Sequence, residues 1–373
     1  MYSFHNSCLP RFAFLPSAFI HFFNMLDLTN AILQGIAVHR IGNKLNEGEL
    51  ICSKKELKLK DDLKSLVSGW FLNAFRSPVW FHFNPDNIKP AGIQAASEIF
   101  ANKEKLLFQS VNLAKHLFEC TAHPKIKEGE LYVCYFTGGM LDEEELDFIG
   151  IFKSESKDTY LKVGLEESVF QLTSEEGINI HKLDKGCLVF NTEADAGYRL
   201  CIVDTVSSGE EARYWKYEFL DIKPRNDSYF KTNSLINLTR DFCKDILVEE
   251  NNVSPLDRMA VMNDSVKYME KNSSFSMEQF EQEVLQEPTV IEAFQDYKRN
   301  YQPLRENNYE LTDIEVAPEA MKKNSKFFKH AVKLDKNFHL YIHGSPQMME
   351  RGYDEEKGMK YYKLFYTNET YPE

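Results

Sequence analysis

The chain has 373 residues, of which 43% are hydrophobic and 27% are charged, and these fractions describe a folded globular protein rather than a disordered one. Its length exceeds what one hydrophobic core usually serves, so two domains or one elaborated domain are expected. The formal net charge of −13 excludes a protein that coats DNA with uniform positive charge, because nucleic-acid binding depends on neutralising phosphates. Any nucleic-acid site must therefore be local.

Residues 1–24 carry one charge, Arg11, and an apolar run that Pro16 interrupts. The run is too short to span a bilayer, and it lacks the basic start and the small-residue cleavage site of a secretory signal. We therefore expect residues 1–24 to be a disordered or artefactual extension ahead of a true start at Met25. No other segment approaches a membrane span, so no membrane contact is expected.

Two amphipathic helices are predicted after this extension. The first opens at Asp61 and Asp62, whose charges suit a helix N-terminus, and its apolar residues recur on one face as far as Ala74. The second uses apolar residues from Leu107 to Phe118.

From Glu130 the apolar residues occur in short runs that are rich in β-branched and aromatic side chains and are separated by turn residues. Eight such runs at hairpin spacing predict a largely antiparallel sheet. They are LYVCYF, LDFIGIF, TYLKVGL, SVFQL, INIHKL, GCLVF, YRLCIVD and YWKYEFLDI. In the last run, a strand that starts at Arg213 would place Trp215, Tyr217 and Phe219 on one buried face.

After Arg225 the apolar spacing becomes helical again. Ser234 or Asn233 can cap a helix whose inner face includes Leu235 and Phe242. Three further helical patterns follow, from Met259 to Met269, after a capping box of Ser276 with Gln279, and from Ile291 to Tyr297.

The segment beyond Pro303 combines a lysine-rich stretch with two predicted strands, FHLYI and KYYKLFYT, which a polar loop through Gly352 would join. The predicted fold class is therefore α+β: N-terminal helices with a largely antiparallel sheet, then a helical segment and a small C-terminal α+β part. We expect the α+β domain to cover residues 25–227, and the helical segment with the C-terminal part to cover residues 228–373.

Motifs for catalysis are scarce in the chain. The seven cysteines are scattered and form no CxxC pair, which argues against a zinc ribbon or a redox pair and for a reducing compartment. No GxSxG or SxxK nucleophile motif and no GxxxxGK phosphate loop occurs. We expect no catalytic residue, no metal, no cofactor and hence no enzyme.

One enzymatic alternative stays open, a Mg²⁺-dependent nuclease. Asp221 and Lys223 match the (D/E)xK element of metal-dependent endonucleases, and Asp204 could supply a second carboxylate for the metal. A chain this acidic produces several such matches by chance, and Glu56-Leu57-Lys58 is another.

Basic residues gather in two places. The stretch from Arg213 to Lys244 holds seven Lys or Arg against four acids, although Asp241 and Asp245 partly cancel its charge. A single phosphate-contacting surface could be formed by Lys223, Arg225, Lys231, Arg240 and Lys244. The second candidate, the most basic segment of the chain, contains Lys322, Lys323, Lys326, Lys329 and Lys333.

From Leu28 to about Thr367, the order of these pieces resembles that of the bacterial nucleoid-associated protein family (the NdpA-like proteins). The segments that carry the resemblance are LTNAILQGIAVHRIGNK, GELYVCYF with DFIGIFK, GCLVFN, RYWKYEFLDIKP, SLINLTRDFCKDIL and FKHAVKLDKNFHLYIHGS. The resemblance implies a cytoplasmic protein that is found with the bacterial chromosome, associates with DNA and has no established catalysis. It carries over no DNA-contact residues.

The expected function is therefore nucleoid association, either by binding double-stranded DNA mainly through phosphates or by joining the nucleoid through a DNA-bound partner. The alternatives are the Mg²⁺-dependent nuclease and a protein-binding scaffold without direct DNA contact. The expected partners are double-stranded DNA or nucleoid proteins, and the expected location is the cytoplasmic nucleoid.

Overall fold

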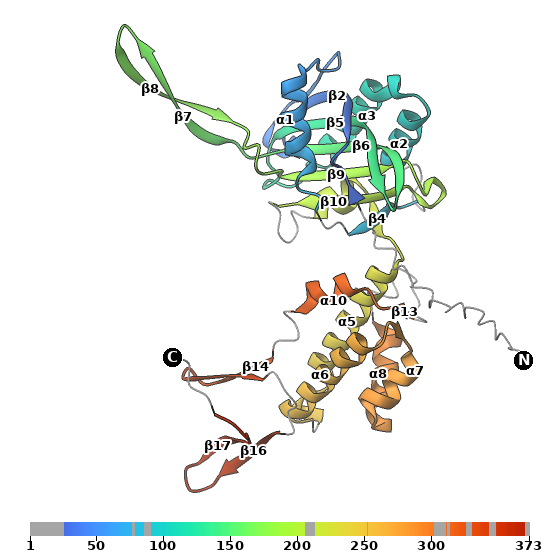
Figure 1. Ribbon diagram of the computed structural model, residues 1–373, viewed down its shortest axis with the longest axis vertical. Helices are drawn as coiled ribbons and strands as arrows, with labels where there is room; N and C mark the ends of the chain where they lie inside the picture. Colours follow the sequence, from blue (N-terminus) through green and yellow to red (C-terminus); the bar gives the residue numbers. More distant parts are fainter. Residues whose placement is uncertain are drawn as a thin grey trace, which may run out of the picture. The chain divides into compact units, whose positions relative to one another are not determined.

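A computed structural model of the chain describes residues 26–76, 79–85, 91–205, 213–251, 253–301, 311, 314–325, 330–342 and 348–369. The predicted extension over residues 1–24 lies outside this set. The chain divides into two compact units, with unit 1 ending at Ile222 and unit 2 beginning at Lys223 (Figure 1). Among the residues described, no helix is both long and apolar enough to cross a bilayer.

Unit 1 is built on one sheet in the order β11-β4-β10-β9-β6-β5-β2-β3, with β1 beside β5. Neighbouring strands from β3 to β4 in this order run antiparallel, so the predicted α+β class with a largely antiparallel sheet is confirmed. The strands of the sheet are β1 (Leu26–Asp27), β2 (Ile32–Ile41), β3 (Leu50–Cys52), β4 (Trp80–Phe83), β5 (Gly129–Leu141), β6 (Glu144–Ser154), β9 (Lys185–Phe190), β10 (Arg199–Asp204) and β11 (Ile222–Pro224). The helices of unit 1 are α1 (Asp61–Leu72), α2 (Ala91–Ala101), α3 (Leu106–Cys120) and the π-helix η4 (Tyr214–Phe219).

Helices cover both faces of the sheet, which explains the nearly continuous apolar character of β5. Leu131 and Val133 pack with α2 and α3 on one face. Tyr132 and Phe136 pack with α1 on the other, where the rings of Phe71 and Phe152 stack at 4.0 Å. The predicted helices from Asp61 and from Leu107 are confirmed as α1 and α3.

The predicted strand YWKYEFLDI is wrong, because most of this run forms η4 and only β11 is extended. Trp215 and Phe219 are buried in the core with α2 and α3, whereas Tyr217 between them is exposed. The buried residues are therefore four apart, as on one side of a helix, and not two apart, as on one face of a strand. The NH of Leu220 donates to the carbonyl of Trp215 five residues earlier, as a π-helix requires. Packing against this core overrides the strand preference of an aromatic-rich run.

Two further corrections concern the neighbouring runs. TYLKVGL and SVFQL form strands β7 (Asp158–Glu166) and β8 (Val169–Gly177), but these pair only with each other and stay outside the main sheet. INIHKL is not a strand, because the chain turns at Asn179. The Asn179 side chain accepts from the NH of His181 at 2.8 Å and its carbonyl accepts from the NH of Lys182 at 3.2 Å, an arrangement that asparagine favours in turns.

His39 is a buried histidine of β2 whose neighbours fix it in the neutral form. Its Nδ1 accepts from the NH of Ser53 at 3.2 Å, so its Nε2 carries the proton and donates to the Ser110 hydroxyl at 2.8 Å. The hydroxyl of Ser110 donates in turn to the carbonyl of Leu107. A second proton on Nδ1 would face the NH of Ser53, and burial lowers the pKa of His39 to about 4.

The stability of unit 1 is therefore expected to fall as the pH drops below the pKa of an ordinary histidine. Between about pH 6.5 and pH 4 the unfolded chain binds a proton that the fold excludes, and roughly 2 kcal/mol is lost across this window once solvent screening is allowed for. Above pH 6.5 His39 contributes no pH dependence. The urea midpoint of unfolding, measured between pH 6.5 and pH 4, should depend less steeply on pH in His39→Gln than in the wild type. His181→Gln, which changes an exposed histidine, should keep the pH dependence of the wild type. If the urea midpoint of His39→Gln depends on pH as steeply as that of the wild type, the prediction is wrong.

Unit 2 is a helical core followed by two β-hairpins (Figure 1). Its α-helices within the described residues are α5 (Ser228–Asp245), α6 (Pro255–Lys271), α7 (Met277–Phe280), α8 (Pro288–Asn300) and α10 (Pro318–Asn324), and the π-helix η6 (Glu281–Leu285) follows α7. Its strands are β12 (Ser274–Phe275), β13 (Ile314–Glu315), β14 (His330–Leu334), β15 (Phe338–Ile342), β16 (Met349–Asp354) and β17 (Met359–Leu364). Phe242 of α5 and Phe294 of α8 meet edge to face in the core at 5.0 Å.

The predicted helices of this unit are confirmed, but the cap of α5 is not. Asp227 caps the helix by accepting from the NH of Phe230 at 2.9 Å, so α5 starts well before the predicted caps Asn233 and Ser234, which lie inside it. Ser276 caps α7 as predicted, accepting from the NH of Gln279.

The predicted C-terminal loop through Gly352 is wrong, because Gly352 lies within β16 and pairs with Tyr361 of β17. A Cβ at Gly352 would lie 2.3 Å from the Tyr361 ring. The glycine therefore marks a close cross-strand contact rather than a turn.

Candidate functional site

One side of α5 carries a row of polar and basic side chains, of which Lys244 is exposed and the others are half-buried. Tyr229, Asn233, Asn237, Arg240 and Lys244 follow one another at intervals of three or four residues, which puts them on one side of the helix. Their Cα atoms span about 22 Å along the helix axis. The opposite side is buried in the core of unit 2 and includes Leu235, Leu238 and Phe242.

Helix α10 packs against the N-terminal half of α5 and extends this row. The Asn324 side chain donates to the Asn233 side chain at 2.9 Å, and the Nζ atom of Lys323 lies 5.8 Å from the centre of the Tyr229 ring. Lys322 and Lys323 are both exposed. We call the row on α5 together with these two lysines the α5 ridge.

Two acids that follow Arg240 on α5 accept hydrogen bonds from Tyr297 of α8 and from Tyr301, the residue that follows α8. Asp241 accepts from the Tyr301 hydroxyl and Asp245 accepts from the Tyr297 hydroxyl, each at 2.7 Å. The helical period places both acids to one side of the ridge. Burial, followed by the hydrogen bond to the carboxylate, raises the pKa of each tyrosine. Asp241 also pairs with Arg240 at 2.8 Å, so the guanidinium is partly neutralised.

The structure divides the basic residues predicted to share one surface. Lys231 precedes Arg240 by nine residues and so lies about 180° from it around α5, away from the ridge. Arg225 pairs with Asp227 at 3.4 Å, and Lys223 belongs to β11.

The lysine-rich segment is only partly within the described residues. Lys322 and Lys323 lie on α10, whereas Lys326 and Lys329 lie outside the described residues. The backbone of Lys333 belongs to β14. The structure thus brings Lys322 and Lys323 to the same helix as Arg240 and Lys244, which sequence spacing alone did not indicate.

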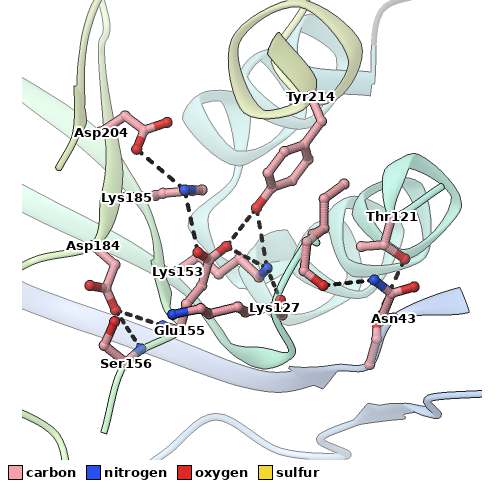
Figure 2. A network of polar contacts seen from close by, with 12 residues as sticks. Asn43, Thr121, Lys127, Lys153, Glu155, Ser156, Asp184, Lys185, Asp204 and Tyr214 are labelled. Atoms are coloured by element: carbon pink, nitrogen blue, oxygen red, sulfur yellow. Dashed lines mark hydrogen bonds and ion pairs between the residues drawn. The ribbon is translucent and has the colours of Figure 1, made fainter. Parts of the chain in front are cut away.

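A second polar cluster lies inside unit 1, between the sheet and η4 (Figure 2). The register places Lys153 of β6 opposite Lys185 of β9, and Lys185 opposite Asp204 of β10. Neither lysine side chain is exposed, at 0% each. Glu155 lies between them, with Oε1 2.7 Å from Lys153 Nζ and Oε2 3.4 Å from Lys185 Nζ.

Tyr214, the first residue of η4, closes this cluster. Its hydroxyl donates to Glu155 at 2.7 Å and accepts from Lys153 at 3.2 Å. Burial raises the pKa of Tyr214 and lowers that of Lys153. Burial also acts to raise the pKa of Glu155, but the two lysines outweigh it, so the pKa of this carboxyl lies below its ordinary value. The cluster is charge-balanced and ties η4 to the sheet.

The residues of the nuclease alternative have structural contacts of their own. Asp204 Oδ1 is 3.3 Å from Lys185 Nζ. The carbonyl of Asp221 accepts from the NH of Asn84 at 2.8 Å, and its backbone φ is 48°. Across the described ranges, no three His, Cys, Asp or Glu side chains gather in a way that could hold a metal ion.

The chain belongs to the family described as nucleoid-associated protein YejK, whose family model matches residues 37–358. The predicted resemblance is therefore confirmed. No curated protein matches the chain.

Proposed function

We propose that this nucleoid-associated protein binds double-stranded DNA directly through the α5 ridge, mainly by phosphate contacts. The observation that supports the proposal is that Arg240 and Lys244 lie on one side of α5 and that α10, which carries Lys322 and Lys323, packs on the same helix, with Lys323 beside Tyr229. The amides of Asn233 and Asn237 lie in the same row and can bond phosphate or sugar oxygens. Under this proposal the protein resides on the cytoplasmic nucleoid.

The dimensions of the ridge suit a duplex. A row of about 22 Å covers roughly two-thirds of a turn of B-DNA, which is enough for several phosphates of one strand. The net charge of −13 repels DNA elsewhere, so binding would depend on this local surface. The same charge favours the competing possibility, a scaffold that reaches the nucleoid only through a DNA-bound protein.

A titration of the full chain with duplex DNA at several salt concentrations separates the two possibilities. With three to four ridge cations engaged, the plot of log K against log salt should have a slope of about −3 to −4, whereas a scaffold shows no binding even at low salt. A flat plot or no binding overturns direct DNA contact.

Repeating the titration with Mg²⁺ tests the nuclease alternative. Cleavage that is lost in Asp221→Asn would replace the binding proposal with a nuclease that uses Asp204, Asp221 and Lys223. Asp221→Asn is the suitable change, because asparagine tolerates the positive φ at this position. Changing Asp204 would also disturb its ion pair with the buried Lys185.

A further inference from the structure

Strands β7 and β8 form a hairpin arm that extends away from the rest of unit 1 (Figure 1). Every residue from Asp158 to Glu176 is exposed. An isolated two-stranded hairpin is marginally stable in water unless one of its faces is covered.

The two faces of the arm differ sharply in chemistry. On one face, Tyr160 donates to Glu175 at 2.7 Å, Lys162 lies 3.2 Å from the same carboxylate, and Gln171 donates to Glu166 at 2.8 Å. These side chains bond to one another and suit contact with water.

The other face is apolar. The register pairs Val163 with Leu172 and Leu165 with Phe170, and Leu161 of β7 lies on the same side. Each of these five side chains belongs to a residue that is 64% to 76% exposed. An apolar face of this kind, backed by a face whose polar side chains bond to one another, is typical of an interaction surface.

Charge argues against DNA or an anionic lipid surface as the occupant. The arm has five acids and one lysine, namely Asp158, Glu166, Glu167, Glu175, Glu176 and Lys162. Phosphates would be repelled by this charge.

We propose that the apolar face of the β7–β8 arm packs against the same face of a second copy of this chain, related by a two-fold axis. The tip of the face is bulky, with Leu165 opposite Phe170, whereas towards the base Leu161 lies opposite the small Ser174. Two arms that pack antiparallel bring each bulky tip over the smaller base of the other, which makes the apolar face self-complementary in shape.

The area of the face is sufficient for such a contact. The five residues together expose roughly 600 Å² per copy, so complete burial in both copies would cover about 1,200 Å², at the lower limit of specific protein interfaces. The polar faces, which carry the hydrogen-bonded Glu166 and Glu175, then point outwards to water on both sides.

Sedimentation equilibrium of the full chain tests the proposal. The wild-type protein should have twice the monomer mass of 43.4 kDa, and Leu172→Glu and Val163→Glu should each give the monomer mass. Thr173→Glu is the matched control, because it adds the same charge to the adjacent residue on the polar face, opposite Lys162, and should leave the dimer intact.

A variant in which residues 159–176 are replaced by a Gly-Ser linker should also be monomeric and keep the circular dichroism of the wild type, which separates loss of the interface from loss of the fold. A wild-type protein that stays monomeric at its highest soluble concentration overturns the proposal and leaves the face for a different protein. A dimer that persists in Leu172→Glu overturns it as well.

Discussion

Glu155→Ala is expected to lower the free energy of unfolding of unit 1 by about 3–5 kcal/mol, because it leaves two buried lysines without the carboxylate that they share. Lys153 and Lys185 lie directly opposite each other on β6 and β9, where like charges repel. Tyr214 also loses the acceptor of its hydroxyl. Thermal unfolding followed by circular dichroism should show a midpoint lower by roughly 10 °C.

The β7–β8 arm offers a matched control for this change. Glu175 likewise accepts from a tyrosine hydroxyl, that of Tyr160, and lies beside a lysine, Lys162, but its side chain is 47% exposed. Glu175→Ala should therefore change the free energy of unfolding very little, because solvent screens an exposed ion pair. Glu155→Gln keeps an acceptor for the Tyr214 hydroxyl but loses the negative charge. Its loss in the free energy of unfolding should therefore lie between those of Glu155→Ala and Glu175→Ala. If Glu155→Ala costs no more than Glu175→Ala, the lysines do not depend on Glu155.

The parts of the fold that sequence predicts correctly are those whose local signals all agree. At α1 the acidic first turn, the apolar spacing and the following Ser-Pro point to the same helix. β5 and β6 combine apolar runs with turn residues between them, and both faces are buried, so no choice of inward face was required.

The corrections arise where residues far apart in sequence decide the local structure. η4 contains a run typical of a strand, but the hydroxyl of Tyr214 bonds to Glu155, 59 residues earlier, and the aromatic rings pack under α2 and α3. Gly352 looks like a turn glycine until Tyr361 is seen to pack against it. Local propensity carries no information about such partners.

The candidate site shows the same limit. Charge counting finds Arg240, Lys244, Lys322 and Lys323, yet it cannot show that the helix carrying the last two packs on the helix carrying the first two. That packing depends on Asp227 capping α5 and on the bond between Asn324 and Asn233, which are 91 residues apart. The helical period also removes Lys231 from the ridge, because it lies about 180° from Arg240 around α5.

Lys244→Glu combined with Lys323→Glu is expected to weaken duplex binding roughly 10- to 100-fold at low salt and to make the slope of log K against log salt shallower by about 2. These lysines lie towards the two ends of the α5 ridge, so the pair tests the ridge along its length. Both side chains are exposed, which keeps the effect on folding small. Fluorescence anisotropy with a labelled duplex at several salt concentrations measures both quantities.

Lys267→Glu combined with Lys271→Glu is the matched control, because these exposed lysines of α6 lie four residues apart in the same unit, and the change in net charge is identical. This variant should bind the duplex only slightly more weakly than the wild type, because long-range interactions between exposed charges are screened by salt. The slope of log K against log salt should stay unchanged. Equal losses in the two variants would mean that binding follows the overall charge of unit 2 and that the ridge has no special role. A loss confined to the ridge variant, together with its shallower slope, requires phosphates to lie against α5 and α10, since only direct contact changes the number of counterions released.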